Sequence, residues 1–88
     1  MEKYPFLNEA IAKILYERRI ALNMSKKKLS ELALIERAYI RSIENAEKTP
    51  TLNAIFYLSE ALEIEPEDFV KQVKAEVKKL MKTHNMGK

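Results

Sequence analysis

Apolar residues recur along this chain at intervals of three and four positions, the spacing that places them on one side of an α-helix. Near the start of the chain they are Leu7, Ile11, Ile14, Leu15 and Leu22. Asn8 can accept a hydrogen bond from a free backbone N–H, and Glu9 suits the positive end of a helix dipole. We therefore predict a first helix over residues 8–22, with Asn8 as its N-cap.

Two short helices are predicted next. Ser25 is a candidate N-cap for a helix that runs to about Leu32. A tight connection at residues 34–35 then leads into a third helix over residues 36–45. The side chains that we expect to face the core are Leu29, Leu32, Ala33, Ile40 and Ile43.

Two prolines mark the later boundaries. Pro50 disfavours helix at the residue before it, and Thr51 can cap a fourth helix over residues 52–62. Pro66 suits the first position of a fifth helix, predicted over residues 66–83. The inward stripe expected on the fourth helix is Leu52, Ile55, Phe56, Ser59 and Leu62. With one glycine in 88 residues for turns, the chain is predicted to be all-α.

The length of 88 residues fits one domain, with a core over residues 8–65 and an added C-terminal helix. Cysteine is absent, which excludes disulfides and thiolate metal sites and favours a reducing, intracellular setting. No apolar run approaches the roughly 18 residues that a membrane span needs, and the start of the chain does not resemble a signal peptide. We expect a cytoplasmic protein that does not associate with membranes.

Charge is distributed unevenly. Residues 13–48 hold nine Lys or Arg and five acidic residues, whereas residues 49–65 hold three glutamates and no basic residue. Positive charge is therefore concentrated in one part of the chain, where a polyanion such as DNA can bind. A basic helix face that is simply solvated is the alternative interpretation of this charge.

Two short helices joined by a tight turn, with one helix before and one after, form the helix-turn-helix pattern. The sequence MSKKKLSELALIERAYIRSIEN at residues 24–45 resembles the core of the Cro/C1 (XRE) family. TPTL at residues 49–52 and LSEAL at residues 58–62 match the continuation of that family without a gap. The resemblance covers about residues 14–69. It implies a five-helix, lambda-repressor-like fold and a regulator that binds double-stranded DNA as a homodimer.

In such a motif the third helix reads base edges in the major groove, and its start is the part that contacts them. Arg37 is the first candidate and Arg41 the second, because arginine bonds guanine O6 and N7 through two N–H groups. Ala38 can contact a thymine methyl group, Ser42 faces outward beside them, and Glu36 can accept a hydrogen bond from cytosine. Outside this motif, solvated arginines would be the simpler interpretation.

The start of the second helix is the candidate site for the DNA backbone, because helix N-termini bind phosphate. Ser25, Lys26 and Lys27 lie there. The family usually has glutamine where this chain has Lys26, and a merely solvated turn remains open for Lys27. By the same resemblance, further backbone contacts are expected at Tyr39, Asn45 and Lys48. For Tyr39 a packing role is an alternative.

The resemblance also implies a structural pair, Arg19 with Glu44, that ties the first helix to the end of the third. Three positions depart from the family. Leu34 and Ala46 replace glycines that are usual after the second and third helices, and a left-handed leucine costs about 1–2 kcal/mol. Glu36 opens the third helix where serine or threonine is common, and its charge repels phosphate.

Beyond the motif, Val70, Val73, Val77 and Leu80 repeat at helical spacing. We interpret this stripe as a dimer interface, with burial against the core of the same chain as the alternative. The single histidine, His84, has no partners for a metal site or a catalytic triad, so we expect no metal, no cofactor and no enzymatic activity.

The sequence ERAYI at residues 36–40 and the added terminal helix are similar to restriction–modification controller proteins. Two other functions stay open. One is a protein-interaction module or antitoxin-like partner with weak or lost DNA binding, which the departures at Leu34 and Glu36 favour. The other is binding of any duplex through charge alone.

Overall fold

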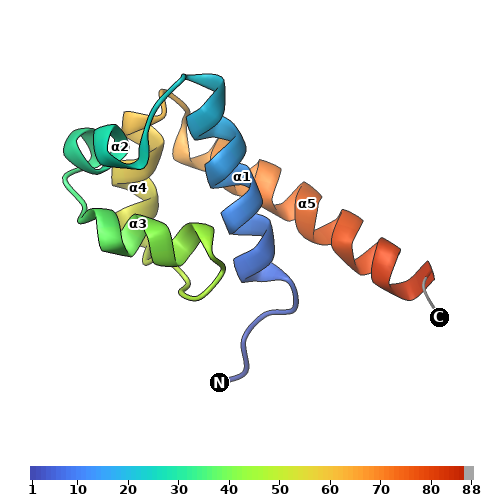
Figure 1. Ribbon diagram of the computed structural model, residues 1–88. Coiled ribbons are helices and arrows are strands. Elements are labelled where there is room, and N and C mark those ends of the chain that lie inside the picture. The colour runs from blue at the N-terminus through green and yellow to red at the C-terminus, as the bar shows by residue number, and fades with distance from the viewer. Residues whose placement is uncertain (87–88) are drawn as a thin grey trace.

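The computed structural model describes residues 1–86, which form helices and no strand (Figure 1). The five helices are α1 (Leu7–Ala21), α2 (Lys26–Ala33), α3 (Arg37–Glu44), α4 (Leu52–Ala61) and α5 (Pro66–Met86). The predicted all-α, five-helix architecture is confirmed. The fifth helix is longer than predicted, since it continues past residue 83 to Met86.

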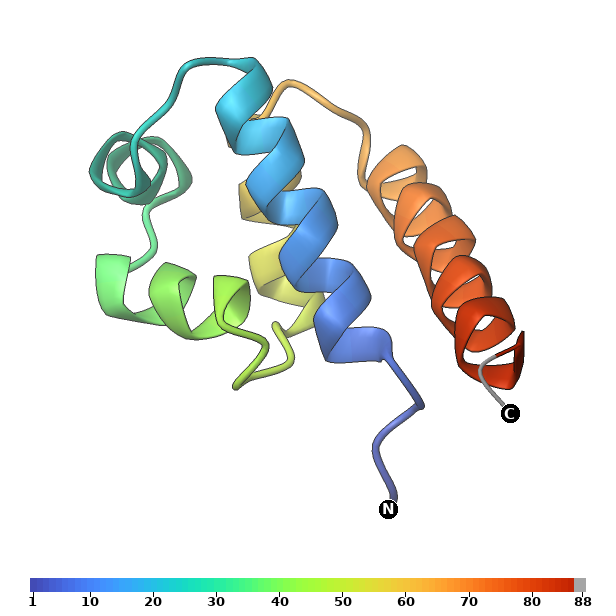
Figure 2. The same cartoon turned by 45° about the vertical axis from the view of Figure 1, so that its right-hand side comes forward.

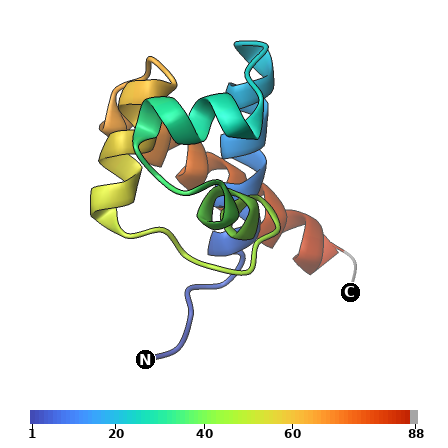
Figure 3. The ribbon, with the colours of Figure 1, turned by 60° about the vertical axis from the view of Figure 1, so that its left-hand side comes forward.

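The helices enclose one core that every element contributes to. α5 lies beside α1 and runs in the opposite direction (Figure 2). α2 and α3 pack against each other, and α2 also packs on α4 (Figure 3). The largest fully buried side chains are Phe69, Leu15, Leu29, Ile40, Ile43, Leu58 and Leu62.

Three helix starts are confirmed by their local geometry. Ser25 accepts a hydrogen bond from the backbone N–H of Lys28 at 2.9 Å. Thr51 accepts one from the backbone N–H of Ala54 at 3.0 Å. Pro66 occupies the first position of α5. These side chains satisfy donors that a helix start leaves free, which explains why the helices begin at those residues.

The predicted cap at Asn8 is wrong. α1 begins one residue earlier, at Leu7, after Phe6 in a left-handed conformation with φ of 63°. Asn8 therefore lies inside the first turn, where its side-chain oxygen accepts a hydrogen bond from the hydroxyl of Thr49. The asparagine ties α1 to the segment between α3 and α4 instead of capping its own helix.

The predicted inward faces of α2 and α4 need correction. Leu32, Leu52 and Phe56 are 47%, 69% and 56% exposed. The buried side of α4 is centred on Leu58, and includes Ala54, Ile55, Ser59 and Leu62. Apolar residues occur on more than one side of α4, so spacing alone could not decide which side packs against the core.

Each of the first four helices is followed by a residue in the left-handed region, and none of these residues is glycine. They are Asn23, Leu34, Ala46 and Glu63, with φ between 54° and 61°. The turn after α2 keeps the hydrogen bonds of an ordinary helix end, because the N–H groups of Leu34 and Ile35 both donate to the carbonyl of Ser30. Leucine thus adopts the conformation for which the family usually has glycine.

Candidate nucleic-acid interface

The third helix has one anchored side and one free side. Ile40 and Ile43 have no exposed surface and fix α3 to the core. Arg37, Ala38 and Arg41 are exposed on the opposite side. This division is the one that a groove-reading helix needs, because its outward side chains are held at fixed positions by its buried ones.

The start of α2 and the free side of α3 line a common shallow hollow. Its lining includes Ser25, Lys26 and Lys27 from α2 together with Arg37 and Arg41 from α3. Both helices lie on the near side of the molecule in Figure 3, in front of α1 and α5. The structure therefore brings the first candidates for base contact and for backbone contact to one surface.

Two other base-contact candidates lie at the borders of α3. Glu36 is the N-cap residue of α3 and is exposed, and its side chain makes no capping hydrogen bond. Its carboxylate thus lies near the positive end of the helix dipole and accepts no capping hydrogen bond from a backbone N–H of α3. Ser42 is half-buried and donates its hydroxyl proton to the carbonyl of Tyr39 at 2.8 Å. Only its oxygen lone pairs remain for a contact with DNA.

Arg19 and Glu44 form the predicted pair. Arg19 Nε donates to Glu44 Oε2 at 2.8 Å, and Nη2 donates to Oε1 at 2.9 Å. The third nitrogen, Nη1, donates to the carbonyl of Met24 at 2.8 Å. Hydrogen bonding to the Glu44 carboxylate raises the pKa of Arg19, against an opposing effect of burial. The guanidinium therefore remains charged and holds α1, the start of the α2 segment and the end of α3 together.

Tyr39 has the packing role that the sequence left as the alternative. It is half-buried against the core, and its hydroxyl oxygen accepts a hydrogen bond from the backbone N–H of Thr51 at 3.3 Å. This bond connects α3 to the first residue before α4. Asn45 and Lys48 are exposed after the C-terminal end of α3, so the predicted backbone contacts are divided between the start of α2 and the segment that follows α3.

The stripe on α5 is largely buried within its own chain. Val73 and Val77 are each 5% exposed and belong to the core cluster, with Leu80 packed against it. Glu76, on the same side of α5, is buried and accepts a hydrogen bond from Lys13 Nζ on α1 at 3.2 Å. Val73 and Val77 are already covered by their own chain, as in the alternative interpretation of the stripe, and a contact with a second copy at this stripe stays a prediction. Val70 is half exposed and Leu80 is half-buried, and the outer edge of the stripe lines an apolar hollow beside Leu7 and Met81.

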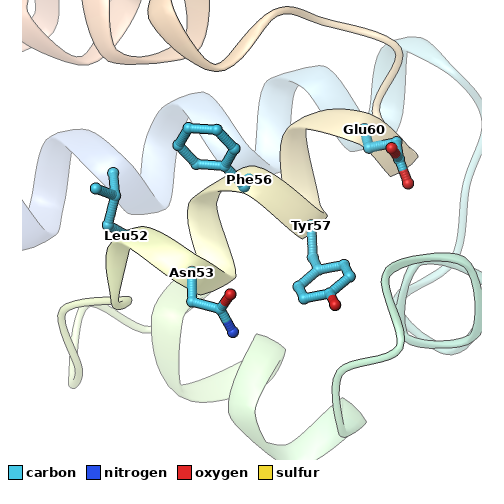
Figure 4. Close-up of a pocket in the computed structure, with 5 residues that line it drawn as sticks. All are labelled: Leu52, Asn53, Phe56, Tyr57 and Glu60. Carbon is cyan, nitrogen blue, oxygen red and sulfur yellow. The ribbon is translucent and has the colours of Figure 1, made fainter.

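An apolar surface that the sequence did not predict lies on α4. Leu52, Phe56 and Tyr57 are exposed there and, with Asn53 and Glu60, line a shallow hollow (Figure 4). We call these five residues the α4 face. The sequence does carry a signal for it, because α4 has more large apolar residues than one buried side can hold.

Comparison with known proteins gave two kinds of match. Residues 15–69 match the model of a helix-turn-helix family. The solved structure of the restriction–modification controller protein C.AhdI from Aeromonas hydrophila is 30% identical and has a TM-score of 0.69. That match covers 75% of this chain and 98% of C.AhdI. A sequence search of curated proteins gave no match.

Two further solved structures share the fold at lower identity. The clp gene regulator ClgR from Corynebacterium glutamicum is 16% identical with a TM-score of 0.86, over 97% of this chain and 90% of ClgR. The controller protein C.Esp1396I, solved as a tetramer with its natural 35 base-pair operator, is 20% identical with a TM-score of 0.75. That match covers 84% of this chain and 97% of C.Esp1396I. Within residues 1–86, no helix is long and apolar enough to cross a membrane.

Proposed function

This chain belongs to the Cro/C1-type helix-turn-helix family, and on that basis we propose that it regulates transcription by binding a near-palindromic operator as a homodimer. The observation that carries the proposal is the surface shared by α2 and α3. Ser25, Lys26 and Lys27 stand beside Arg37 and Arg41 there, so one face offers both phosphate contacts and groove contacts. One protein of the same fold was solved on its operator.

In this proposal the exposed start of α3 enters the major groove. Arg37 pairs with a guanine, and Arg41 pairs with a second base one helical turn further along. Each well-formed pair contributes about 1–3 kcal/mol of discrimination against the wrong base. Ala38 contacts a thymine methyl group. Glu36 accepts a hydrogen bond from a cytosine amino group, which favours sequences that place cytosine at that point.

The start of α2 and the segment after α3 hold the DNA backbone. Free N–H groups at a helix start and the helix dipole attract phosphate. Lys26 and Lys27 add charge at this point, and their contacts carry no sequence information. Lys48 and Asn45 bind the backbone beyond the other end of α3. The Tyr39 hydroxyl keeps its proton for a phosphate oxygen while its own oxygen accepts from Thr51.

A dimer explains how a protein with one short recognition helix per chain distinguishes its operator from other DNA sequences. A single half-site involves few base pairs, whereas a two-fold dimer places two recognition helices about 34–36 Å apart, one turn of DNA. The operator is then an inverted repeat. We propose repression or autoregulation, since such a dimer covers the DNA it binds, and we propose no catalytic step. A DNA ligand implies a cytoplasmic protein.

The experiment that tests this function is the selection of bound duplexes from a random DNA pool at two salt concentrations. We expect a near-palindrome that stays enriched at the higher salt. The matched control is the Arg37→Ala, Arg41→Ala double variant, whose substitutions lie on the exposed side of α3 and leave its buried anchors intact. If the wild-type chain enriches no sequence and loses all binding as salt rises, contact is by charge alone and the proposed function is wrong.

A further inference from the structure

We infer that the two copies in the proposed dimer meet through the α4 face, around Leu52, Phe56 and Tyr57, and not through the stripe on α5. This inference rests on the proposed dimeric function. It follows from the apolar surface that each helix leaves exposed. α5 uses Val73 and Val77 to cover α1, whereas the large apolar side chains of the α4 face keep about half of their surface exposed within residues 1–86.

The α4 face has the composition of an interface centre. Leu52, Phe56 and Tyr57 are 69%, 56% and 43% exposed. In Figure 4, Leu52 and Phe56 extend along one edge of α4 and Asn53 and Tyr57 along the other, with Glu60 at the end. Aromatic residues are enriched and charged residues depleted at the centres of protein interfaces, and a polar rim surrounds them. The α4 face follows this arrangement, with one charged residue at its edge.

DNA is not the partner for this surface. No lysine or arginine occurs from residue 49 to residue 70, whereas five acidic residues lie in that segment. Phosphate would therefore be repelled from it. The basic residues that can contact phosphate lie on the surface formed by α2 and α3. The two surfaces are formed by different residues, so one copy can bind DNA and a second copy at the same time.

A second copy of the chain fits the charge on the α4 face. In the arrangement that we infer, the two α4 helices cross in antiparallel orientation about the two-fold axis, so a residue four positions after the centre faces one four positions before it. With Phe56 at the centre, Glu60 of each copy lies opposite Leu52 of the other. Leu52 begins α4, where the helix dipole is positive and a carboxylate is stabilised. The single charge on the surface is thus placed favourably by self-association.

The size of the surface fits the centre of such a contact. Fully buried aromatic side chains each remove about 150–250 Å² from water. From the exposed fractions above, the three apolar residues offer on the order of 300 Å², where a standard interface buries roughly 800 Å² per partner. The α4 face supplies the apolar centre, and Asn53, Glu60 and their neighbours supply the rim.

The position of α4 also links the interface to DNA reading. The N-terminal cap of α4, Thr51, donates its backbone N–H to the hydroxyl of Tyr39 on α3. Seven residues separate the end of α3 from the start of α4. A contact between two α4 helices therefore sets the distance between the two recognition helices through a short and hydrogen-bonded connection.

Sedimentation equilibrium of the full chain, without DNA, tests the inference. We expect a wild-type dimer and at least a tenfold weaker dimer in the Leu52→Gln, Phe56→Gln variant. Two matched controls replace residues of similar exposure on other helices, Ile20→Gln on α1 and Val70→Gln on α5. Both should dimerise as the wild type does. Since all these side chains are exposed, circular dichroism should show the same helix content and melting in every variant.

The charge argument has its own variant. Glu60→Lys places a positive charge opposite the positive end of α4 in the second copy, so it should weaken the dimer, and Glu60→Gln should weaken it less. A dimer that is unaffected by the Leu52 and Phe56 changes, or that is broken by Val70→Gln alone, overturns the inference. A wild-type monomer that still selects a DNA sequence also overturns it. A wild-type dimer that selects no sequence would instead contradict the proposed function and leave the interface standing.

Discussion

Arg19 and Glu44 form a bidentate ion pair across 25 positions of the chain, with both side chains almost fully buried. The pair joins α1 to the end of α3. The third donor of the guanidinium is used by the carbonyl of Met24, where the chain leads into α2. One side chain therefore fixes the two helices of the DNA-reading motif to the helix that supports them.

Loss of either partner should destabilise the fold strongly, because it leaves a charge buried without its counterion. We expect Glu44→Gln and Arg19→Met each to lower the free energy of unfolding by about 3–5 kcal/mol. The Arg19→Met, Glu44→Leu double variant should cost clearly less than the sum. Urea denaturation measures all three, and additive costs would show that the two residues act separately.

The same pair predicts how stability responds to alkali. Glu44 raises the pKa of Arg19 in the folded chain above its ordinary value. The stabilisation from this group is therefore complete below the ordinary pKa of arginine and is lost only as pH rises through the higher folded value. Urea denaturation should therefore show that, between pH 7 and pH 10, the wild-type chain loses no more stability than the Arg19→Met variant does.

Arg37 should determine the base preference at one position of each half-site. Arg37→Ala removes its paired contacts with guanine, so affinity for the selected operator should fall by about 1–3 kcal/mol and that position should accept other bases. Competition binding against duplexes altered at single positions checks this. Equal losses for every duplex would mean that Arg37 binds the backbone and does not read bases.

Lys26 should act without regard to sequence. Lys26→Ala should weaken operator and unrelated duplexes by the same factor, and the slope of log affinity against log salt should fall by about one. Lys82→Ala on α5 is the control, because it removes an equal charge on a helix outside the proposed DNA surface. A similar change of slope in the control would indicate a general effect of net charge.

Leu34 holds a conformation that glycine adopts without strain. Its φ is 57°, and its side chain is 79% exposed, so little packing would be lost by its removal. Leu34→Gly should relieve about 1–2 kcal/mol of backbone strain and lose about 0.5–1 kcal/mol to chain entropy. Thermal melting should show a small net stabilisation. Leu34→Ala keeps the strain, so an equal gain there would disprove the backbone explanation.

Val77 should behave as a core residue. Val77→Asp buries an unpaired carboxylate between α5 and α1 and should cost at least about 3 kcal/mol or prevent folding. Val70→Asp, on an exposed side of the same helix, should change stability by less than about 0.5 kcal/mol. A folded Val77→Asp variant that is merely monomeric would restore Val77 to an interface between copies.

The features that the sequence predicted correctly depend on local chemistry. Ser25 and Thr51 cap helices through hydrogen bonds to residues three positions away. Pro66 begins a helix because its fixed backbone angle suits that position. The outward placement of Arg37 follows from the buried positions of its helix and needs no knowledge of the remaining fold.

The features that it predicted wrongly depend on contacts between distant segments. The sequence favours Asn8 as a cap, but Thr49 binds its side chain instead. Phe56 fits a helical stripe that predicts a core position, although α4 buries the adjacent side centred on Leu58. The helical spacing of Val73 within its stripe is equally compatible with a core position and with an interface between two copies. Only the packing of α5 on α1 separates the two interpretations.

That packing has a consequence for how the protein is made. The ribosome synthesises α1 first and α5 after the other four helices, yet Phe69, Val73 and Val77 on α5 complete the core that α1 begins. The hydrogen bond from Lys13 to Glu76 likewise cannot form until Glu76, 63 positions later in the chain, has been synthesised. During synthesis, the DNA-reading helices leave the ribosome on a scaffold that is still open along one side. The core that supports these two helices is therefore complete only after α5 has been translated, and in the proposed function stable operator binding must wait for that point.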